Sequence, residues 1–326
     1  MKAQLKTRVT EMLGIEYPII QGCMQWISRA QLVGAVSAVG GLGILSSSSC
    51  YTAEELRAEI KKVREITDKP FAVNITLLPA SFVPDYDGYI RVCIEENVKI
   101  IETAGRIPKE DMIAKIKGAG IIWIHKCTIV KHALKAQTAG CDMVVADGFE
   151  CAGHPGENDI GTMVLTPSFV EALNIPVITA GGIGTGRQMA AALMLGAEGV
   201  YMGTRFLLTE ECPVLDKVKD HLAEHATEMD TVLLLRTYVN TTRAYKSKVA
   251  VSVLEREKAG LEFADIAGDM SGKKACEMFF ENGDIDNCGT ICSGQTVGLI
   301  NKVIPVREAI ESIMKECIET LGKFSV

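Results

Sequence analysis

The chain has 326 residues, of which 48% are hydrophobic and 23% charged, with a formal net charge of −7. This composition is typical of a folded globular protein and excludes a disordered chain. The absence of a basic stripe argues against a nucleic-acid partner. No uncharged apolar run reaches the roughly 20 residues that a membrane span requires, and the charged opening stretch lacks the apolar core of a signal peptide. We therefore expect a cytoplasmic protein with one large barrel plus a small domain, or with two average domains.

The eleven cysteines are scattered, with no Cys-x-x-Cys pair and no Cys/His zinc pattern. Because disulfide frameworks and metal sites show regular spacing, we expect reduced, mostly buried thiols and no metal site. Cys23 and Cys151 lie near the functional residues discussed below, but neither has an activating base nearby in sequence. We therefore interpret both as packing residues. The sequence does not fix the oligomeric state, and a homodimer is compatible with it.

Eight short apolar, β-branched runs alternate with helical patterns over the first two hundred residues. The predicted strands are Tyr17–Gln21, Gly43–Leu45, Phe71–Ile75, Ile100–Thr103, Ile121–His125, Met143–Asp147, Val177–Ala180 and Gly199–Met202. The predicted helices between them are Arg29–Val39, Ala53–Ile66, Asp87–Asn97, Lys109–Lys117, Thr128–Thr138, Thr166–Ala172 and Gly186–Leu195. Continuously hydrophobic strands that alternate with helices indicate a parallel sheet covered on both faces. Eight such units favour an α/β fold of the (β/α)8 TIM barrel type, although periodicity alone leaves an open doubly wound sheet as an alternative.

The pattern changes after Phe206. Residues 211–290 are charged and helical in character, rich in Glu, Lys and Met, and contain no strong strand candidate. We predict that this segment forms a small, mostly helical domain that covers the substrate, and that residues 1–210 and 291–326 form the barrel. The final segment, Val306–Leu321, has helical periodicity and is predicted to close the barrel as its last helix.

Polar residues and glycines follow several predicted strands, at the edge where such barrels place their reactive groups. Two glycine-rich turns are the most informative: Ala180–Gly186 follows the seventh strand and opens a helix, and Gly203-Thr204 follows the eighth. Glycine lets the backbone approach a phosphate closely, and a helix N-terminus offers free N–H donors. Since the loops after strands seven and eight are the usual phosphate site of these barrels, we predict a mononucleotide phosphate there. The glycine run does not match the dinucleotide fingerprint, which belongs after a first strand.

A histidine stands in a glycine-lined loop beyond the sixth strand, within Asp147–Gly156. Small neighbours would let a flat ligand approach the imidazole of His154, which titrates near neutrality as a general base or hydrogen-bond donor requires. A loop histidine that only caps a helix or binds water is the alternative. Lys126 and Asp147 are charges at the ends of apolar strands, where they seldom lie without partners. They are predicted to pair with each other or to hydrogen-bond the polar edge of a ring such as a flavin.

The other four histidines carry less information. His125 precedes Lys126 at a strand end, and we interpret it as structural. His132 is interpreted as a helix-surface residue. The i, i+4 pair His221 and His225 has the spacing of two metal ligands on one helix face, but no third ligand is evident, so we interpret both as surface residues.

Six segments form a distinctive set. They are Tyr-Pro-Ile-Ile-Gln-Gly-Cys-Met (17–24), Gly-Gly-Leu-Gly (40–43), Pro-Phe-Ala-Val-Asn (70–74), Ala-Gly-His-Pro-Gly (152–156), Ala-Gly-Gly-Ile (180–183) and Leu-Gly-Ala-x-x-Val-x-x-Gly-Thr-Arg-Phe (195–206). As a set, with Ser-Gly-Gln (293–295) near the end, they resemble the nitronate monooxygenase family, also called 2-nitropropane dioxygenases, over essentially the whole chain. FMN-dependent enoyl-ACP reductases share most of these segments. They more often carry a Gly-Gly-His loop without a following acidic stretch, whereas this chain has Ala152 in place of the first glycine.

The resemblance implies an FMN-binding barrel in which His154 is the catalytic residue that faces the substrate over the flavin. It also implies FMN contacts from Gly22, Met24, Asn74, Lys126, Asp147, Gly153, Gly181, Gly182, Gly203, Thr204, Met270, Ser271 and Gln295. The implied reaction is the oxidation of an alkyl nitronate, such as propionate 3-nitronate, by FMN and O2 to a carbonyl compound and nitrite or nitrate. Two alternatives stay open. One is an NAD(P)H-dependent reductase of enoyl-ACP or enoyl-CoA on the same scaffold, and the other is a non-catalytic flavin-binding or redox-sensing protein.

Overall fold

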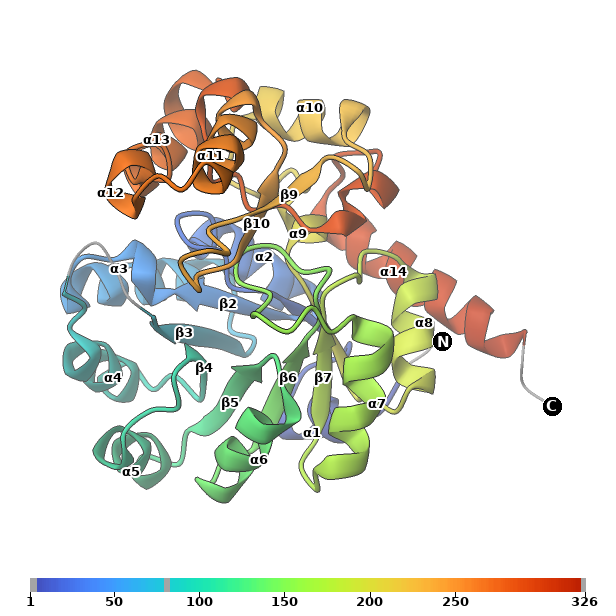
Figure 1. Cartoon of the computed structure of the whole chain (residues 1–326). Helices are drawn as coiled ribbons and strands as arrows, with labels where there is room; N and C mark the ends of the chain where they lie inside the picture. The colour runs from blue at the N-terminus through green and yellow to red at the C-terminus, as the bar shows by residue number, and fades with distance from the viewer. Residues whose placement is uncertain (1–4, 79–82, 324–326) are drawn as a thin grey trace.

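The computed structural model describes residues 5–78 and 83–323. Eight parallel strands form a closed barrel in which each strand pairs with the next along the chain (Figure 1). The strands are β1 (Ile19–Gln21), β2 (Leu42–Ser46), β3 (Phe71–Leu77), β4 (Ile100–Gly105), β5 (Ile122–Cys127), β6 (Met143–Asp147), β7 (Val177–Ala180) and β8 (Gly199–Met202). The predicted (β/α)8 barrel is confirmed, and the open sheet is wrong because β1 and β8 pair with each other.

Helices alternate with the strands and surround the barrel. They are α2 (Ala30–Val39), α3 (Ala53–Ile66), α4 (Tyr86–Glu95), α5 (Glu110–Gly118), α6 (Val130–Thr138), α7 (Thr162–Ala172), α8 (Gly186–Met194) and the short α9 (Thr204–Leu207). Every predicted helix is present. Helix α7 begins at Thr162, four residues before the predicted start, because the Glu150 carboxylate accepts hydrogen bonds from the Thr162 N–H and hydroxyl.

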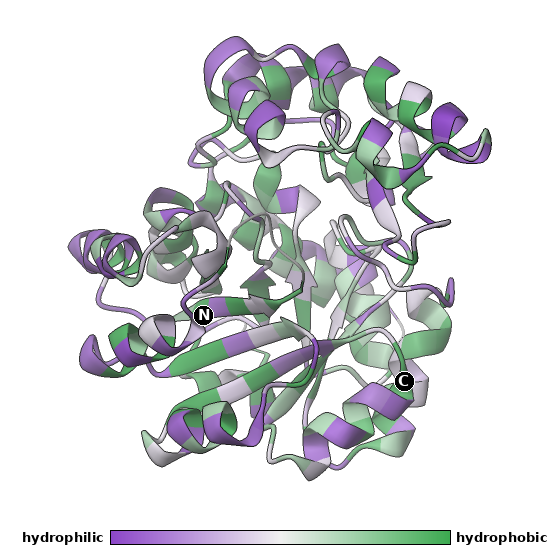
Figure 2. Cartoon of the chain, turned by 60° about the vertical axis from the view of Figure 1, so that its left-hand side comes forward, coloured by the Kyte–Doolittle hydropathy of each residue, from purple (hydrophilic) through white to green (hydrophobic). Residues whose placement is uncertain are grey.

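The strands are apolar because both of their faces are buried. Along β6, Met143 and Val145 belong to the core inside the barrel, whereas Val144 and Ala146 pack beneath the outer helices. A helix that the sequence patterns did not predict, α1 (Arg8–Leu13), contributes to the interior core through its apolar side chains. Figure 2 shows the same order, with apolar strands at the centre and hydrophilic residues on the outer helices. In the described ranges, no helix combines the length and apolar character that a membrane crossing needs.

A second group of elements lies above the barrel in Figure 1. It contains α10 (Asp216–His225), β9 (Thr231–Leu234), β10 (Thr242–Tyr245), α11 (Lys248–Lys258), α12 (Phe263–Ile266) and α13 (Gly272–Glu277), followed by short turns of 3₁₀ and π helix. The sequence offered no strong strand candidate in this mostly helical region, but β9 and β10 form an antiparallel hairpin. Each strand has only four residues, so it is too short to show a clear alternation of apolar and polar residues. Leu234, Ala244 and Val253 belong to a small core of this upper region. Its division from the barrel at residues 211 and 290 stays a prediction.

The last helix, α14 (Val306–Gly322), confirms the predicted closing helix. It lies beside α8 (Figure 1) and shares one hydrophobic core with α2 and α8, to which Ile310 and Ile313 contribute. The chain after β8 therefore leaves the barrel, builds the upper region, and returns to pack against the barrel's own helices.

Candidate active site

Polar side chains from five strands converge at the carboxyl-terminal edge of the barrel. Asn74 of β3 and Glu102 of β4 are paired in register, and the Asn74 Nδ2 donates to the Glu102 Oε2 over 2.7 Å. On β5, the Lys126 Nζ lies 3.8 Å from the Oδ2 of Asp147 on β6. The Tyr201 hydroxyl of β8 donates to the Glu102 Oε1 over 3.0 Å, and the Lys126 Nζ lies 5.0 Å from the centre of the Tyr201 ring. The predicted residues Asn74, Lys126 and Asp147 thus belong to one cluster.

The cluster combines one cation with two buried carboxyl groups. Burial raises the pKa of Glu102, although Lys126, Asn74 and Tyr201 oppose the shift. Burial also raises the pKa of Asp147, again against Lys126. At Lys126 burial lowers the pKa, but Tyr201, Asp147 and Glu102 outweigh it and hold the pKa well above its usual value. The lysine therefore stays charged, and it can stabilise negative charge that develops on a ligand beside it.

Tyr201 was not predicted as a site residue, because in sequence it is one more member of an apolar strand. Its position explains Gly22: a Cβ on that residue would lie 2.4 Å from the Tyr201 Cε1. The Tyr201 hydroxyl also accepts from the Cys23 N–H over 2.8 Å. Glu102 was not assigned a role either, although the sequence held a signal. It is a carboxylate inside an apolar run, and such a group is rarely buried without partners.

The loop after β1 brings Met24 to the same edge. Ser28 holds this loop, since its Oγ accepts from the Met24 N–H over 2.8 Å and from the Gln21 Nε2 over 2.9 Å. The Met24 Sδ is the nearest atom to a Cβ built on Gly203, at 4.0 Å. The predicted residues Met24 and Gly203 are therefore neighbours, and the backbone at Gly203 is open to a ligand.

The glycine turn after β7 packs closely on the loop after β6. Gly181 and Gly182 have positive φ angles of 83° and 72°. A Cβ on Gly181 would lie 2.6 Å from the carbonyl oxygen of Gly148, so only glycine allows this approach of two backbones. The turn is thus fixed against the loop that carries His154.

The N-terminus of α8 does not offer the free N–H donors that were predicted for a phosphate. The Glu316 Oε2, from α14, accepts from the Gly186 N–H over 2.8 Å and from the Arg187 N–H over 3.3 Å. The Gln188 Oε1 accepts from the Gly184 and Thr185 N–H groups at 2.9 and 3.1 Å. This part of the prediction is wrong, because a carboxylate of the protein already occupies the anion position at this helix end.

Free donors remain nearby, at the ends of β7 and β8. Within the described ranges, the N–H groups of Gly182, Gly203 and Thr204 donate to no other group of the protein. The Gly294 N–H donates to the Thr204 Oγ1 over 2.9 Å, which places the preceding residue, Ser293, beside them. The Ser293 Oγ is buried and has no hydrogen-bond partner among the described residues. Unpaired donors on a glycine backbone suit phosphate oxygens.

His154 stands in the loop after β6, and its side chain is solvent-accessible although protein surrounds it. Burial, followed by the charge of Lys126, lowers the pKa of His154 below its ordinary value, so that the ring is neutral at pH 7. Apart from its chain neighbours, no described residue has an atom within 4 Å of a Cβ built on Gly153. An accessible, neutral imidazole beside an open backbone suits a role in contact with substrate.

The remaining predicted contacts differ in their placement. The Gln295 N–H donates to the carbonyl oxygen of Glu150 over 3.1 Å, which brings Gln295 to the loop after β6. Met270 packs against the upper core, and the Ser271 Oγ caps α13 by accepting from the Lys274 N–H over 3.4 Å. No hydrogen bond links these two residues to the other predicted contacts in the part of the chain that the structure describes, so their cofactor roles stay predictions.

The other histidines and the cysteines differ in how deeply they are buried and in their hydrogen-bond partners. His125 is buried, with its Nδ1 2.7 Å from the Thr103 Oγ1, in keeping with its interpretation as a structural residue. His132 and His225 are exposed as predicted, but His221 is half-buried and its Nε2 lies 3.0 Å from the Tyr245 hydroxyl. All eleven cysteines are free, and eight are buried. Burial raises the pKa of Cys23 to about 12 and that of Cys151 well above its usual value, which supports their interpretation as packing residues.

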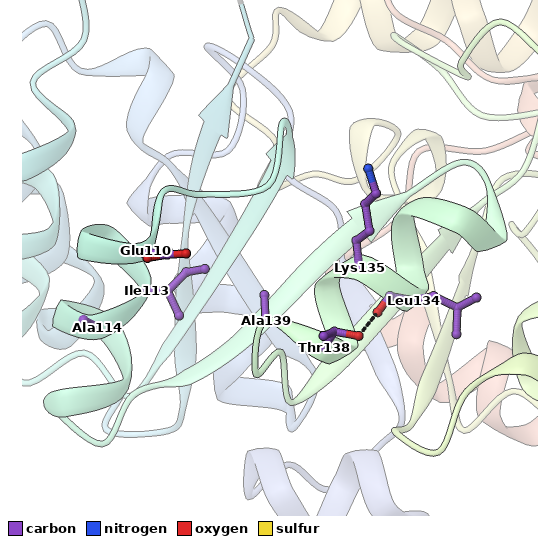
Figure 3. A pocket seen from close by; sticks show the side chains of 7 residues that line it. All are labelled: Glu110, Ile113, Ala114, Leu134, Lys135, Thr138 and Ala139. Carbon is purple, nitrogen blue, oxygen red and sulfur yellow. Dashed lines mark hydrogen bonds between the residues drawn. The ribbon is translucent and has the colours of Figure 1, made fainter.

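A separate groove lies outside the barrel between α5 and α6 (Figure 3). The residues that line it are Glu110, Ile113, Ala114, Leu134, Lys135, Thr138 and Ala139. The Thr138 hydroxyl donates to the carbonyl oxygen of Leu134 over 2.9 Å and is therefore already used within α6. Because no predicted site residue lines this groove, the strand ends remain the candidate active site.

Comparisons with known proteins agree with this fold. The family model for nitronate monooxygenase matches residues 6–316. The (3aS,4S,5R,7aS)-5-hydroxy-7a-methyl-1-oxo-octahydro-1H-indene-4-carboxyl-CoA dehydrogenase of Mycobacterium tuberculosis is 34% identical and aligns over 98% of each chain. A probable nitronate monooxygenase of Staphylococcus aureus is 34% identical over 77% of this chain and 79% of its own. Among solved structures, FabK from Thermotoga maritima has a TM-score of 0.90, 37% identity and 98% coverage of both chains. Nitroalkane oxidase from Streptomyces ansochromogenes has a TM-score of 0.83 and 25% identity, covering 97% of this chain and 99% of its own.

Proposed function

Since the chain belongs to the nitronate monooxygenase family of oxidoreductases, we propose that it binds FMN at the barrel mouth and oxidises alkyl nitronates, such as propionate 3-nitronate, with O2. The products would be a carbonyl compound and nitrite or nitrate. The observation that carries the proposal is the accessible His154 in the loop after β6, at the barrel edge where the Lys126 Nζ lies 3.8 Å from the Asp147 Oδ2. We also propose a cytoplasmic location, in keeping with the free and mostly buried thiols.

The residues at the strand ends fit FMN. The unpaired N–H groups of Gly182, Gly203 and Thr204 would hold its phosphate, and Lys126 and Asn74 would contact the polar edge of its ring. When bound, FMN would supply electron acceptance and reactivity with O2. Lys126 would stabilise the negative charge that the ring gains, because its pKa is held high by Tyr201, Asp147 and Glu102.

His154 would act on the substrate side of this arrangement. Its neutral imidazole would hydrogen-bond the nitro oxygens of a nitronate or accept the proton of a nitroalkane. The open backbone at Gly153 leaves room for a small, flat substrate beside the ring. The substrate would thus meet a proton acceptor from the loop after β6 and a fixed cation from β5.

Replacement of His154 tests the proposal directly. We expect His154→Ala to retain FMN, because the predicted phosphate and ring contacts lie on other residues, and to lower turnover by about 10² to 10⁴, the usual contribution of a general base. FMN absorbance after gel filtration and oxygen uptake with propionate 3-nitronate measure the two effects. An unchanged rate in the variant would overturn the assigned role of His154.

The second candidate is a flavin-dependent oxidoreductase of thioesters, such as an NAD(P)H-dependent enoyl-CoA reductase. It is favoured by a relative that matches nearly the whole chain and whose substrate is a carboxyl-CoA, whereas the alignment with the probable nitronate monooxygenase of Staphylococcus aureus covers 77% of this chain. Oxygen uptake with nitronate and without nicotinamide would support the first function. NAD(P)H oxidation that depends on an enoyl-CoA, with nitronate inert, would support the second.

A further inference from the structure

Glu102 of β4 is fully buried, and both of its carboxyl oxygens accept hydrogen bonds. Its Oε2 accepts from the Asn74 Nδ2 over 2.7 Å, and its Oε1 accepts from the Tyr201 hydroxyl over 3.0 Å. Strands β4 and β8 lie on opposite sides of the eight-stranded ring, so the bond to Tyr201 crosses the inside of the barrel. Because an apolar residue would fill this space at a lower cost in free energy, the carboxyl group indicates a role beyond packing.

The two partners of Glu102 indicate that it is ionised. The Cys23 N–H donates to the Tyr201 hydroxyl oxygen over 2.8 Å, which leaves the hydroxyl proton for Glu102. The carboxamide nitrogen of Asn74 can only donate. Both partners therefore present a proton to Glu102, and a carboxylate accepts both, whereas a protonated carboxyl group would direct its own proton at one of them.

The carboxylate also determines how the side chain of Asn74 is turned. The Thr76 hydroxyl donates to the Asn74 Oδ1 over 2.7 Å, while the Asn74 Nδ2 donates to Glu102. A carboxamide can exchange its oxygen and nitrogen by a half-turn, but a carboxylate only accepts, so the nitrogen must face Glu102. Asn74 thus presents its polar groups to a bound ring in one fixed order.

The charge of Glu102 lies opposite that of Lys126 on a shared aromatic side chain. The Tyr201 hydroxyl contacts Glu102, and the Lys126 Nζ lies 5.0 Å from the centre of the Tyr201 ring. The same Nζ lies 3.8 Å from the Asp147 Oδ2. Lys126 favours negative charge on a neighbouring ligand, and the two carboxyl groups oppose it. The affinity of this edge for an anion therefore depends on whether Glu102 is charged.

We propose that Glu102 is a positioning residue that fixes the carboxamide of Asn74 and lowers the reduction potential of FMN bound at the strand ends. The inference rests on the proposed function, which places the FMN ring at Lys126 and Asn74. Reduction adds negative charge to the ring. A carboxylate close to the ring in a buried site opposes this added charge, so the oxidised form is bound more tightly relative to the reduced form.

The first test is a redox titration of the FMN-loaded full chain against a reference dye, without O2. Glu102→Gln removes the charge with little change in volume. We expect the ratio of Kd for oxidised FMN to Kd for reduced FMN to rise about tenfold, which raises the two-electron reduction potential by about 30 mV. Glu102→Gln with the wild-type potential would overturn the inference.

The second test separates the position of the carboxylate from its charge. Glu102→Asp keeps the charge, but its shorter side chain cannot reach both Asn74 and Tyr201. We expect FMN affinity to fall at least threefold, because Asn74 is no longer held, and the reduction potential to stay nearer to wild type than to Glu102→Gln. Wild-type FMN affinity in a folded Glu102→Asp protein would also overturn the inference.

Glu257→Gln is the matched control for loss of a buried carboxylate. Glu257 lies on α11 of the upper region (Figure 1), and its carboxylate accepts from the N–H groups of Leu235 and Thr237. This variant should keep the wild-type potential and FMN affinity, and a potential raised as much as in Glu102→Gln would overturn the assignment to Glu102. The titration needs no turnover, so inert nitronate together with the expected shift would count against the proposed function and leave the role of Glu102 standing.

Discussion

His125 lies at the end of a buried hydrogen-bond chain that fixes its charge state. The Trp123 Nε1 donates to the Thr103 Oγ1 over 2.7 Å, which leaves the threonine hydroxyl proton for the His125 Nδ1, 2.7 Å away. The imidazole is then an acceptor in a site that water does not reach. Burial, followed by the charge of His132, lowers the pKa of His125 to about 4.

This lowered pKa predicts a loss of stability in acid. Above pH 6.5 the ring is neutral in the folded and the unfolded chain, whereas between pH 6.5 and 4 only the unfolded chain takes up the proton. The free energy of unfolding should therefore fall by about 3 kcal/mol between pH 7 and 4 through this residue alone. His125→Gln, which can still accept from Thr103, should lack this component in urea unfolding at both pH values.

The comparison between wild type and variant isolates His125 from opposing groups. The raised pKa values of Glu102 and Asp147 have the opposite sign, since the folded chain then takes up protons more readily than the unfolded chain as the pH falls. Wild type and His125→Gln share that contribution, so it cancels when the pH dependence of one is subtracted from that of the other. Equal pH dependence in wild type and His125→Gln would show that the buried ring is protonated in the folded state.

The residues of the site differ in how well sequence could predict them. Lys126 and Asp147 were predicted to pair with each other or to hydrogen-bond the polar edge of a ring, because a charge at the end of an apolar strand needs a partner. The structure places them 3.8 Å apart. Tyr201 reaches Glu102 from 99 positions along the chain, through space that only Gly22 leaves open. Such a contact depends on how strands β4 and β8 face each other inside the barrel, which local periodicity does not contain.

At the scale of elements, the start of α8 also depends on a contact between distant residues that local sequence patterns do not contain. The capping box of Thr185 and Gln188 is a local signal, but Glu316 comes from α14, 130 residues away. A helix N-terminus attracts anions of any origin. The sequence pattern predicted a phosphate at the start of α8, but the protein's own carboxylate occupies this position. The hairpin β9–β10 was also missed because it depends on contacts between distant residues. Its short strands show no alternating pattern in the sequence, and they are held by their pairing with each other and by the antiparallel bridge between Arg243 of β10 and Gly153.

Removal of the Glu316 carboxylate separates helix capping from cofactor binding. Glu316→Ala leaves the Gly186 and Arg187 N–H groups without their acceptor, so the free energy of unfolding should fall by about 1 kcal/mol. FMN affinity should change by less than twofold, because its phosphate is proposed to bind at Gly182, Gly203 and Thr204. Glu319→Ala, an exposed carboxylate on the same helix, is the control. A clear gain in FMN affinity in Glu316→Ala alone would instead place the phosphate at α8.

At the scale of the whole molecule, the eight repeated units determined the barrel, and this part of the fold was predicted. Each unit buries an apolar strand beneath a helix, so the pattern repeats along the sequence. The upper region has no such repeat. It is joined to the barrel by a shared hydrophobic core, to which Val218, Leu222 and Phe279 belong together with Leu32 and Val200. Long-range hydrogen bonds add to this core, such as the Arg243 bridge to Gly153 and the Gly294 bond to Thr204. These contacts connect the upper region and the returning chain with the strand ends where FMN is proposed to bind.

Binding of FMN should therefore stabilise the whole chain by mass action. At a free FMN concentration 100 times its Kd, the free energy of unfolding should rise by about 2.7 kcal/mol, provided that the unfolded chain does not bind FMN. In Asn74→Ala the Glu102 carboxylate loses one donor and the proposed ring contact is lost. If binding weakens tenfold, the gain at the same FMN concentration falls to about 1.4 kcal/mol. Asn174→Ala, at the opposite end of the strands, should keep the full gain in urea titrations with and without FMN. Equal gains in Asn74→Ala and Asn174→Ala would exclude Asn74 from the cofactor site, and the absence of any gain in the wild type would exclude FMN itself.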